Sequence, residues 1–257
     1  MKPLAELDRR DVRVVLLDID DTLTTAGKLT AQAYAALEAL QRSGRLAIAV
    51  TGRAAGFCEY VARLWPLDAV VGENGGFYYW SDAGTVHREY REEATTRARN
   101  RERLAAIARA IVPAVPGSAV ASDLRYRETD LAIDYAEEVP PLPLAAAEHI
   151  GELMRREGLR VALSSIHVHG WFGDYDKLST VRDLLRGRFG LGADRDREAA
   201  VYIGDSPNDA SMFAFFPKSV GVANVRRYVG RIDAEPQYIT NASYGAGFAE
   251  LVEHLLR

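Results

Sequence analysis

Two pairs of aspartates stand where runs of apolar residues end. Asp18 and Asp20 close a run of branched apolar residues that predicts a strand buried on both faces. Because side chains alternate along a strand, these two carboxylates point to the same side. Asp205 and Asp209 follow a second apolar run and are four residues apart across the start of a helix, so they too can face one space. Four acids at two strand ends predict a site for one hard cation such as Mg²⁺, which compensates crowded carboxylates.

Other interpretations of these acids stay open from the residues alone. Asp18 and Asp20 would also suit a turn after the strand, and acids near a helix start stabilise the helix dipole. An EF-hand calcium loop is excluded, because counting from Asp18 puts Leu23 and Leu29 where that loop needs Gly and Glu. The presence of both acid pairs favours the cation site.

Residues suited to binding an anion lie between the two acid pairs. Thr51 and Gly52 follow a predicted strand and offer a hydroxyl and an unhindered backbone amide near a helix start. Lys177 is one of only four lysines among the 32 basic residues, so it is not a default surface cation. Its compact charge can neutralise a phosphate and steady a carboxylate. A helix cap for Thr51 and a solvated Lys177 are the alternatives.

The composition excludes several classes of protein. Of the 257 residues, 48% are hydrophobic and 26% are charged, which is enough apolar material for a compact core. A formal net charge of −4 gives no reason to expect nucleic acid as a partner. The single cysteine, Cys58, excludes an internal disulfide, and no apolar leader or membrane-spanning run is present. We therefore expect a cytoplasmic protein without a membrane partner, and the sequence leaves its oligomeric state unknown.

The elements that must position these residues follow an α/β pattern at both ends of the chain. Apolar runs alternate with amphipathic helical stretches in the first and last thirds, which predicts a parallel sheet covered by helices. Between them, a hairpin over 77–89, a polar helix over 92–112 and four short strand candidates indicate antiparallel structure. We expect a Rossmann-like core from residues 1–81 and 173–257, with an inserted α+β domain over 82–172.

In their order along the chain, these motifs resemble those of the haloacid dehalogenase superfamily of phosphohydrolases. The chain carries D-x-D-x-T at Asp18–Thr22, then Thr51 and Lys177, and then G-D-x-x-N-D at Gly204–Asp209. The segment Gly72-Glu73-Asn74-Gly75 and the long insert before Lys177 are similar to the subfamily with a large α/β cap. That subfamily, IIB, includes Cof-type, sucrose-phosphate, trehalose-phosphate and mannosyl-phosphoglycerate phosphatases. The resemblance covers essentially the whole chain and implies a core of that superfamily with an inserted cap.

The resemblance implies a role for each motif residue. Asp18 would attack phosphorus and form an aspartyl-phosphate, while Asp20 would protonate the leaving alkoxide and then activate water. The metal, Mg²⁺, would be held by Asp18, the backbone carbonyl of Asp20, Asp205 and, directly or through its neighbours, Asp209. The phosphoryl oxygens would be held by Thr51, Gly52, Lys177 and Asn208. Asp21 stands where many relatives have Gly and is expected to serve in the turn, within which Thr22 would also bond.

Substrate choice would depend on the inserted segment. Arg127 and Glu128 resemble the arginine–glutamate segment with which sugar-phosphatase relatives contact substrate, so they are the predicted substrate-binding residues; a solvated turn is the alternative. His167 and His169 share one face of a predicted strand and are candidates for bonding sugar hydroxyls. No zinc-type spacing accompanies these two histidines.

The residues and the resemblance together predict a magnesium-dependent phosphomonoester hydrolase. Its substrate would be a small phosphorylated metabolite, such as a sugar phosphate or a polyol or glycerate phosphate. A phosphomutase of the same fold is one alternative, and a non-catalytic metabolite-binding protein is the alternative from a different class. Retention of both acid pairs together with Thr51 and Lys177 favours the enzyme.

Overall fold

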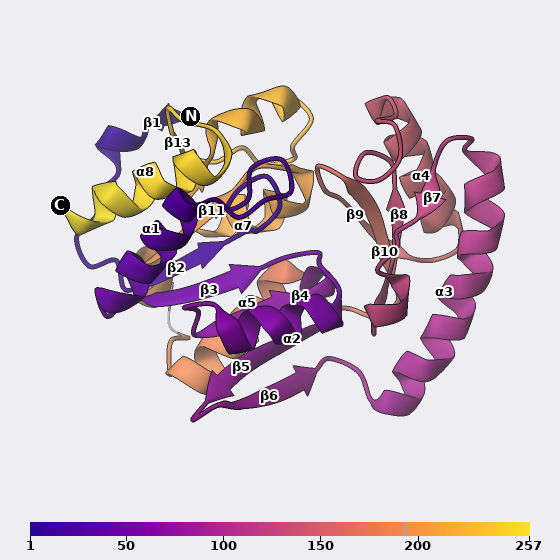
Figure 1. The fold of residues 1–257 in the computed structure, drawn as a ribbon, viewed down its shortest axis with the longest axis horizontal. Coiled ribbons are helices and arrows are strands. Elements are labelled where there is room, and N and C mark those ends of the chain that lie inside the picture. The colour runs from indigo at the N-terminus through magenta and orange to yellow at the C-terminus, as the bar shows by residue number, and fades with distance from the viewer. Residues whose placement is uncertain (193) are drawn as a thin grey trace.

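The computed structural model describes residues 1–192 and 194–257 and contains a larger and a smaller β-sheet (Figure 1). The strands of the larger sheet are β1 (Lys2–Pro3), β2 (Val14–Leu17), β3 (Leu46–Val50), β4 (Ala69–Gly72), β5 (Phe77–Asp82), β6 (Thr85–Tyr90), β11 (Ala200–Gly204), β12 (Lys218–Gly221) and β13 (Tyr238–Ile239). The α-helices in the same parts of the chain are α1 (Ala31–Arg42), α2 (Ala55–Leu64), α5 (Lys177–Phe189), α6 (Asp194–Glu198), α7 (Ala210–Phe215) and α8 (Tyr244–Leu256).

The smaller sheet is built from the middle of the chain. Its strands are β7 (Ala119–Val120), β8 (Asp130–Asp134), β9 (Arg160–Leu163) and β10 (His167–Trp171), accompanied by helices α3 (Ala94–Ala114) and α4 (Leu144–Arg156). Short 3₁₀ turns are η1 (Leu4–Glu6), η2 (Glu73–Gly75), η3 (Leu124–Tyr126), η4 (Pro207–Asp209) and η5 (Ala223–Tyr228).

The larger sheet has the strand order β1-β13-β12-β11-β2-β3-β4-β5-β6, and the smaller has the order β7-β8-β10-β9. Neighbouring strands of the larger sheet are parallel from β1 to β4, whereas β5 and β6 are antiparallel additions at its edge. The smaller sheet is antiparallel throughout. The expected α/β fold, a large parallel sheet together with a second antiparallel one, is confirmed.

The central strands are buried because their side chains are apolar on both faces. Residues Val14–Leu17 of β2 are at most 1% exposed, and β2 lies between β3 and β11. One apolar cluster joins alternate residues of β2 to α1, α2 and α8, and a second joins the others to α5 and α7. Alternate residues of a strand face opposite sides, so helices cover both faces of the sheet, as Figure 1 shows.

The smaller sheet has helices on one face. Apolar residues of α3 and α4, among them Leu104 and Ile150, pack against Leu131, Ile133 and Val168 of β8 and β10. In Figure 1 these helices lie on the side of the sheet that is turned away from the larger sheet, while the arrowheads of β2 and β3 point toward its other face. That other face is therefore turned to the carboxyl ends of the parallel strands.

The sequence predicts that the inserted segment begins at residue 82, but one strand after that residue belongs to the larger sheet. Strand β6 lies beyond that residue, yet it pairs with β5 from Phe77↔Tyr90 to Asp82↔Thr85 and so extends the larger sheet. A hairpin at the edge of a parallel sheet has the same local sequence pattern as a hairpin in a separate domain, and only the pairing distinguishes them. The segment that builds the smaller sheet therefore starts after Tyr90. The division of the chain into two domains stays a prediction.

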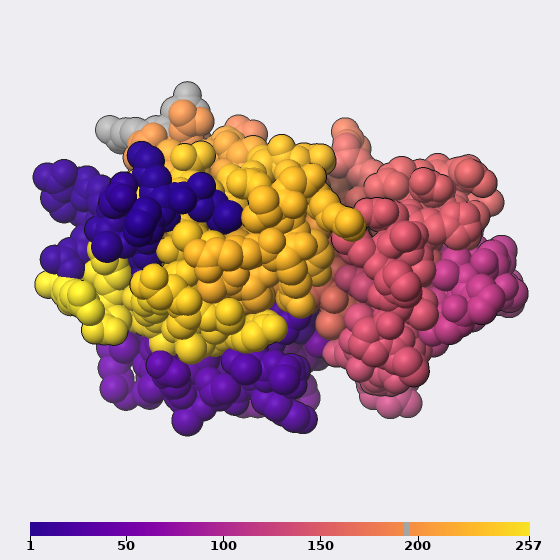
Figure 2. All heavy atoms as spheres, turned by 90° about the horizontal axis from the view of Figure 1, so that it is seen from above, coloured from indigo at the N-terminus to yellow at the C-terminus, as the bar shows by residue number. Residues whose placement is uncertain are grey.

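The two ends of the molecule are made by different parts of the chain. The C-terminus lies at the end of the molecule that is far from the smaller sheet, and the N-terminus lies beside β1 and β13 (Figure 1). Figure 2, seen from above, shows the middle of the chain gathered at the opposite end. Within the described ranges, none of the helices has the length and apolar character needed to span a bilayer.

Candidate active site

Three neighbouring strands bring the predicted groups to one edge of the larger sheet. Asp18 follows β2, Thr51 follows β3 and Asp205 follows β11, and β2 pairs in parallel with both of the other strands. Parallel strands end at the same edge, so residues far apart in the chain meet there. Lys177 is the first residue of α5, whose N-cap is Asp176. The helix start thereby adds the lysine to the same edge.

Lys177 joins the two acid pairs. Its Nζ lies 2.9 Å from Oδ1 of Asp18 and 2.8 Å from Oδ1 of Asp209, and all three side chains are at most 5% exposed. Burial opposes the charge of Lys177, but the two carboxylates outweigh burial and raise its pKa. Burial also raises the pKa of Asp18, and Lys177 opposes this only in part. The two carboxylates therefore favour the charged form of the lysine.

Asp209 is held by hydrogen bonds on both of its oxygens. Oδ1 accepts from Lys177 and from the Tyr202 hydroxyl, and Oδ2 accepts from the backbone N–H groups of Asp205 (3.0 Å) and Ser206 (3.2 Å). The last bond is half of a capping box at the start of η4. Asp209 is thus suited to fixing Lys177 and the turn that carries Asp205.

The buried acids fit a hard cation. One carboxylate oxygen from each of Asp18, Asp205 and Asp209 lies within 4.8 Å of the others. In the part of the chain that the structure describes, buried Oδ1 of Asp205 has no hydrogen-bond partner, while Oδ2 accepts from Asn224 and Arg227, each at 3.0 Å. Burial and the charge of Asp209 raise the pKa of Asp205 to about 8, against the effect of Arg227. A buried carboxylate oxygen without a donor is a natural ligand for a cation.

Asp20 belongs to a chain of ion pairs that reaches the smaller sheet. Its carboxylate accepts from Nε (2.9 Å) and Nη2 (2.6 Å) of Arg53. Nη2 also donates to Oε1 of Glu137 (2.6 Å), whose Oε2 lies 2.9 Å from Nε2 of His167. Burial raises the pKa of Glu137, but His167 and Arg53 outweigh burial and lower it to about 2. Asp20 is therefore held in place from both sheets.

Thr51 and Gly52 offer donors to an anion. The Thr51 hydroxyl is buried and accepts from the N–H of Arg53 (3.1 Å), which leaves its own proton free to donate. Among the described residues, the N–H of Gly52 has no acceptor. A Cβ on Gly52 would lie 2.8 Å from Nε2 of His169, so only glycine fits beneath that ring. The loop therefore leaves the N–H of Gly52 without an acceptor in the described part of the chain.

A small cavity lies directly at these groups. It measures about 10 Å³, room for roughly one water-sized group. The larger sheet contributes Asp18, Asp20, Gly52, Arg53, Ser206 and Asn208 to its walls, and the segment of the smaller sheet contributes Ser164, Ser165, His167 and His169. Ser165 is 7% exposed, and its Oγ has no partner within the described part of the chain. A donor is therefore available on the side of the smaller sheet.

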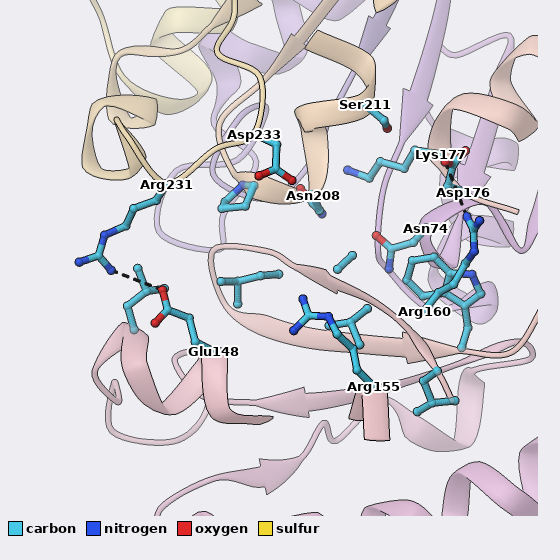
Figure 3. A pocket seen from close by; sticks show the side chains of 17 residues that line it. Asn74, Glu148, Arg155, Arg160, Asp176, Lys177, Asn208, Ser211, Arg231 and Asp233 are labelled. Atoms are coloured by element: carbon cyan, nitrogen blue, oxygen red, sulfur yellow. Dashed lines mark ion pairs between the residues drawn. The ribbon is translucent and has the colours of Figure 1, made fainter. Parts of the chain in front are cut away.

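A larger cavity of about 530 Å³ adjoins the small one, because Asn208 lines both. Figure 3 shows Lys177 and Asn208 on one side of this space and Arg155 of α4 on the other. Arg160 and Arg231 also line it and pair with acids of the same cavity, Asp176 and Glu148. Lys177 therefore lies at the wall of a space between the two sheets.

Arg127 and Glu128, the predicted substrate-binding pair, line neither of these cavities. The Arg127 guanidinium is buried and donates to Asp123 (2.8 and 2.9 Å), to Asp130 (2.7 Å) and to the carbonyl of Gly52 (3.0 Å). The carboxylate of Glu128 accepts from Arg101 of α3 (2.6 Å). Substrate contact by these two residues stays a prediction.

The turn after β2 differs in one detail from the expectation. Thr22 bonds within the turn through its backbone N–H, which donates to the carbonyl of Ile19 (3.4 Å), whereas its buried hydroxyl has no hydrogen-bond partner among the described residues. The hydroxyl that bonds within the turn is that of Thr24, which donates to the carbonyl of Ile19 and accepts from the N–H of Asp21, both at 3.2 Å. Asp21 has φ of 56°, a left-handed conformation that glycine adopts without strain.

Sequence reasoning assigns no role to several residues of the site. Two of these residues could have been identified from the sequence. Arg53 directly follows Thr51 and Gly52, and Tyr202 carries a hydroxyl inside an otherwise apolar strand. Glu137 and Ser165 lie in connections next to β8 and β10, and nothing in the sequence separates them from other loop residues. Their positions follow from the arrangement of the two sheets.

Comparisons with known proteins extend over nearly the whole chain. No family model matches. The chain is 30% identical over 254 residues to a phosphoglycolate phosphatase of Natronomonas pharaonis, covering 94% of this chain and 97% of that protein. It is 26% identical to a phosphoglycolate phosphatase of Methanothrix thermoacetophila, over 95% of this chain and 97% of that one.

Solved structures share the fold at lower identity. Thermoplasma acidophilum 0175 is 16% identical with a TM-score of 0.70, covering 95% of this chain and 98% of its own. The sucrose-phosphatase of Synechocystis sp. PCC6803, in complex with sucrose and phosphate, is 17% identical with a TM-score of 0.63 and the same coverage, 95% and 98%. A subclass IIB sugar phosphatase is 13% identical with a TM-score of 0.63, over 94% and 98%.

The family follows from these comparisons and from the order of the motifs. A relative with 30% identity spans almost the full length of both chains, and the solved structures with the same two-sheet fold include a sugar phosphatase of subclass IIB. The chain accordingly belongs to the haloacid dehalogenase superfamily, in the subfamily with a large α/β cap, and is a phosphoric monoester hydrolase.

Proposed function

We propose that this phosphatase hydrolyses the phosphomonoesters of small metabolites with Mg²⁺ bound and through an aspartyl-phosphate on Asp18. The observation that carries the proposal is the contact of Lys177 with Asp18 (2.9 Å) and Asp209 (2.8 Å) beside the buried carboxylate of Asp205. A fixed ammonium at this point reduces the negative charge that an incoming phosphate meets. It also holds Asp18 in one orientation, and positioning and charge neutralisation are the main means of assisting phosphoryl transfer.

Two carboxyl groups would share the chemistry. A carboxylate oxygen of Asp18 forms a bond to phosphorus while the ester oxygen leaves with the bonding electrons, and Asp20 gives that oxygen a proton. Asp20 then takes a proton from a water molecule whose oxygen attacks phosphorus, which releases inorganic phosphate and restores Asp18. The ion pair with Arg53 needs the ionised form of Asp20, so it would orient this carboxylate for the second proton transfer, in which Asp20 takes a proton from water.

The phosphoryl oxygens would be held by the groups that have free donors. These are the hydroxyl of Thr51, the N–H of Gly52, the ammonium of Lys177 and the side-chain amide of Asn208. Thr51 and Gly52 come from the loop after β3, whereas Lys177 and Asn208 come from the start of α5 and from η4. Donors on two sides fix the three oxygens while the bond to the leaving group breaks.

Mg²⁺ would be held by Asp18, by Asp205 and by the backbone carbonyl of Asp20. Asp209 would act through its hydrogen bonds, since both of its oxygens already accept from Lys177, Tyr202 or the backbone. When bound, the ion supplies charge compensation for the carboxylates and for the phosphate oxygens. The donor-free oxygen of Asp205 supports this assignment.

The leaving group would lie between the two sheets, beside Ser165. The Ser165 hydroxyl is buried at the small cavity without a partner, so it can donate to an oxygen of the leaving group. We take 2-phosphoglycolate as the first substrate, because the relatives named for that ester are 26–30% identical over nearly the full chain. Sugar and glycerate phosphates form the second class. We also propose that residues 91–172 form the cap domain that selects among them.

The test is phosphate release by the purified protein over a panel of esters. The panel is 2-phosphoglycolate, 3-phosphoglycerate, glucose 6-phosphate, glycerol 3-phosphate and p-nitrophenyl phosphate, each with MgCl₂, with excess EDTA, and with Mg²⁺ restored. We expect release with Mg²⁺ that stops in EDTA and returns with the metal. Undiminished release in EDTA would falsify the metal assignment, and isomerised ester without free phosphate would indicate a mutase instead.

A further inference from the structure

The loop that presents Thr51 and Gly52 is held by one short segment of the larger sheet, at the end of β4. The carbonyl of Thr51 accepts from the N–H of Asn74 (3.1 Å), and the carbonyl of Arg53 accepts from the N–H of Glu73 (3.2 Å). The N–H of Ala55, at the start of α2, donates to Oε1 of Glu73 (2.8 Å). Glu73 and Asn74 therefore set the path of the loop from one side.

The same Glu73 is bound by the segment that enters the smaller sheet. Its buried carboxylate accepts from the backbone N–H groups of Glu128 (3.0 Å), Thr129 (2.5 Å) and Asp130 (3.2 Å), and from the Thr129 hydroxyl (2.6 Å). Glu73 is 0% exposed and has φ of 44°, a left-handed conformation that is unfavourable for a residue other than glycine. The surrounding contacts must therefore fix this backbone, as is common at functional sites.

A second hydrogen bond joins the segment 127–130 directly to the loop that carries Thr51 and Gly52, the phosphate-binding loop. Nη1 of Arg127 donates to the carbonyl of Gly52 (3.0 Å), and the rest of the guanidinium is occupied by Asp123 and Asp130. Asp130 in turn accepts from Asn74 (3.4 Å) and lies 3.0 Å from Nδ1 of His169. The guanidinium of Arg127 and the carboxylates of Glu73 and Asp130 are thus engaged within the protein, whereas Oδ1 of Asn74 has no partner among the described residues.

We propose that residues 127–130 position the phosphate-binding loop, Arg127 through the carbonyl of Gly52 and Thr129 through Glu73. This inference rests on the proposed function, since it concerns the same phosphate site. With its carbonyl held by Arg127, Gly52 keeps one backbone orientation, and its free N–H stays directed to the phosphate. Arg127 and Thr129 are thus positioning residues, which act on the reaction without touching the leaving group.

A positioning role has a distinct kinetic signature. Because the loop binds the phosphoryl group that every ester shares, its displacement lowers kcat for all esters by the same factor. A residue that contacts the leaving group instead lowers kcat/KM for the ester that makes the contact and leaves other esters unchanged. Two esters with unlike leaving groups, 2-phosphoglycolate and p-nitrophenyl phosphate, therefore separate the two roles.

The experiment uses matched pairs of variants in the full chain. Thr129→Val removes the hydroxyl donor with little change of shape, and Thr129→Ser keeps it. Arg127→Met removes the donor to Gly52, and Arg127→Lys keeps a cation there. For each variant, kcat and KM are measured on both esters with Mg²⁺, the dissociation constant of inorganic phosphate is measured by calorimetry, and folding is checked by circular dichroism.

We expect Thr129→Val and Arg127→Met to lower kcat about tenfold or more on both esters equally and to weaken phosphate binding, with Thr129→Ser close to wild type. Unchanged kcat and phosphate affinity in the folded variants would overturn the inference. So would a loss confined to 2-phosphoglycolate. If Arg127→Met does not fold, Thr129→Val decides alone. If the wild-type protein hydrolyses no ester of the panel, the proposed function fails, and phosphate affinity still tests the positioning of the loop.

Discussion

Nζ of Lys177 lies 2.9 Å from Oδ1 of Asp18, although 159 positions separate the two residues in the chain. The contact forms because the start of α5 lies at the edge of the sheet where β2 ends. The lysine is buried between two carboxylates, those of Asp18 and Asp209. Lys177 therefore connects Asp18, which follows β2, to Asp209, which lies in η4.

Lys177→Met should remove at least about 99% of the phosphatase activity, a loss of roughly 2.7 kcal/mol or more of transition-state stabilisation. The substitution also leaves Asp18 and Asp209 buried without their cation, so the melting temperature without Mg²⁺ should fall. Lys2→Met, at an exposed lysine, is the matched control and should change neither quantity. Steady-state kinetics and thermal melts of the two variants measure this; normal turnover by Lys177→Met would remove the lysine from the mechanism.

Ser165→Ala should lower kcat/KM for 2-phosphoglycolate about tenfold while leaving that for p-nitrophenyl phosphate nearly unchanged. Its hydroxyl has no partner in the described part of the chain, so its removal should not lower the melting temperature. Ser164→Ala is the control, for which we expect a lower melting temperature. The Ser164 hydroxyl accepts from the N–H of His167 (3.0 Å) and donates to its carbonyl (3.2 Å), so that variant should lose stability. Equal kinetics of Ser165→Ala and wild type on 2-phosphoglycolate would exclude the contact.

Glu137 predicts a pH dependence of stability. Its pKa is lowered from 4.5 to about 2 because His167 and Arg53 outweigh the effect of burial. A lowered pKa contributes stability that is present above pH 4.5 and is lost as the pH falls toward 2, here about 1–3 kcal/mol. Glu137→Gln should therefore be less stable than wild type at pH 7, and the difference should shrink by about pH 3. Melting temperatures across that range test it, and a constant difference would contradict the linkage.

The core of the site could be predicted from the sequence because strand burial and parallel topology leave few choices. A strand that is apolar on both faces must lie inside a sheet, and acids directly after it must lie at the sheet's carboxyl edge. Asp18, Thr51 and Asp205 follow that rule, and their order along the chain carried the resemblance to the family. No knowledge of loop paths was needed for these residues.

The contacts between the two sheets could not be predicted in the same way. Glu137 meets Arg53, and Glu73 meets Thr129, only because of how the smaller sheet is seated over the larger one. Such pairs have no fixed spacing and no periodic pattern. The sequence also could not predict that β6 belongs to the larger sheet. Alternating hydrophobic residues identify a hairpin but do not show which sheet the hairpin extends.

The most direct measurement is the rate of phosphate release from 2-phosphoglycolate by Asp18→Asn with saturating Mg²⁺, compared with wild type. The account predicts no detectable turnover, because an amide cannot serve as the nucleophile. It also predicts a folded variant whose melting temperature without metal is not lower, because one charge leaves a crowded cluster of buried acids. If the folded variant keeps more than about a tenth of the wild-type rate, a loss under ~1.4 kcal/mol, Asp18 is not the nucleophile.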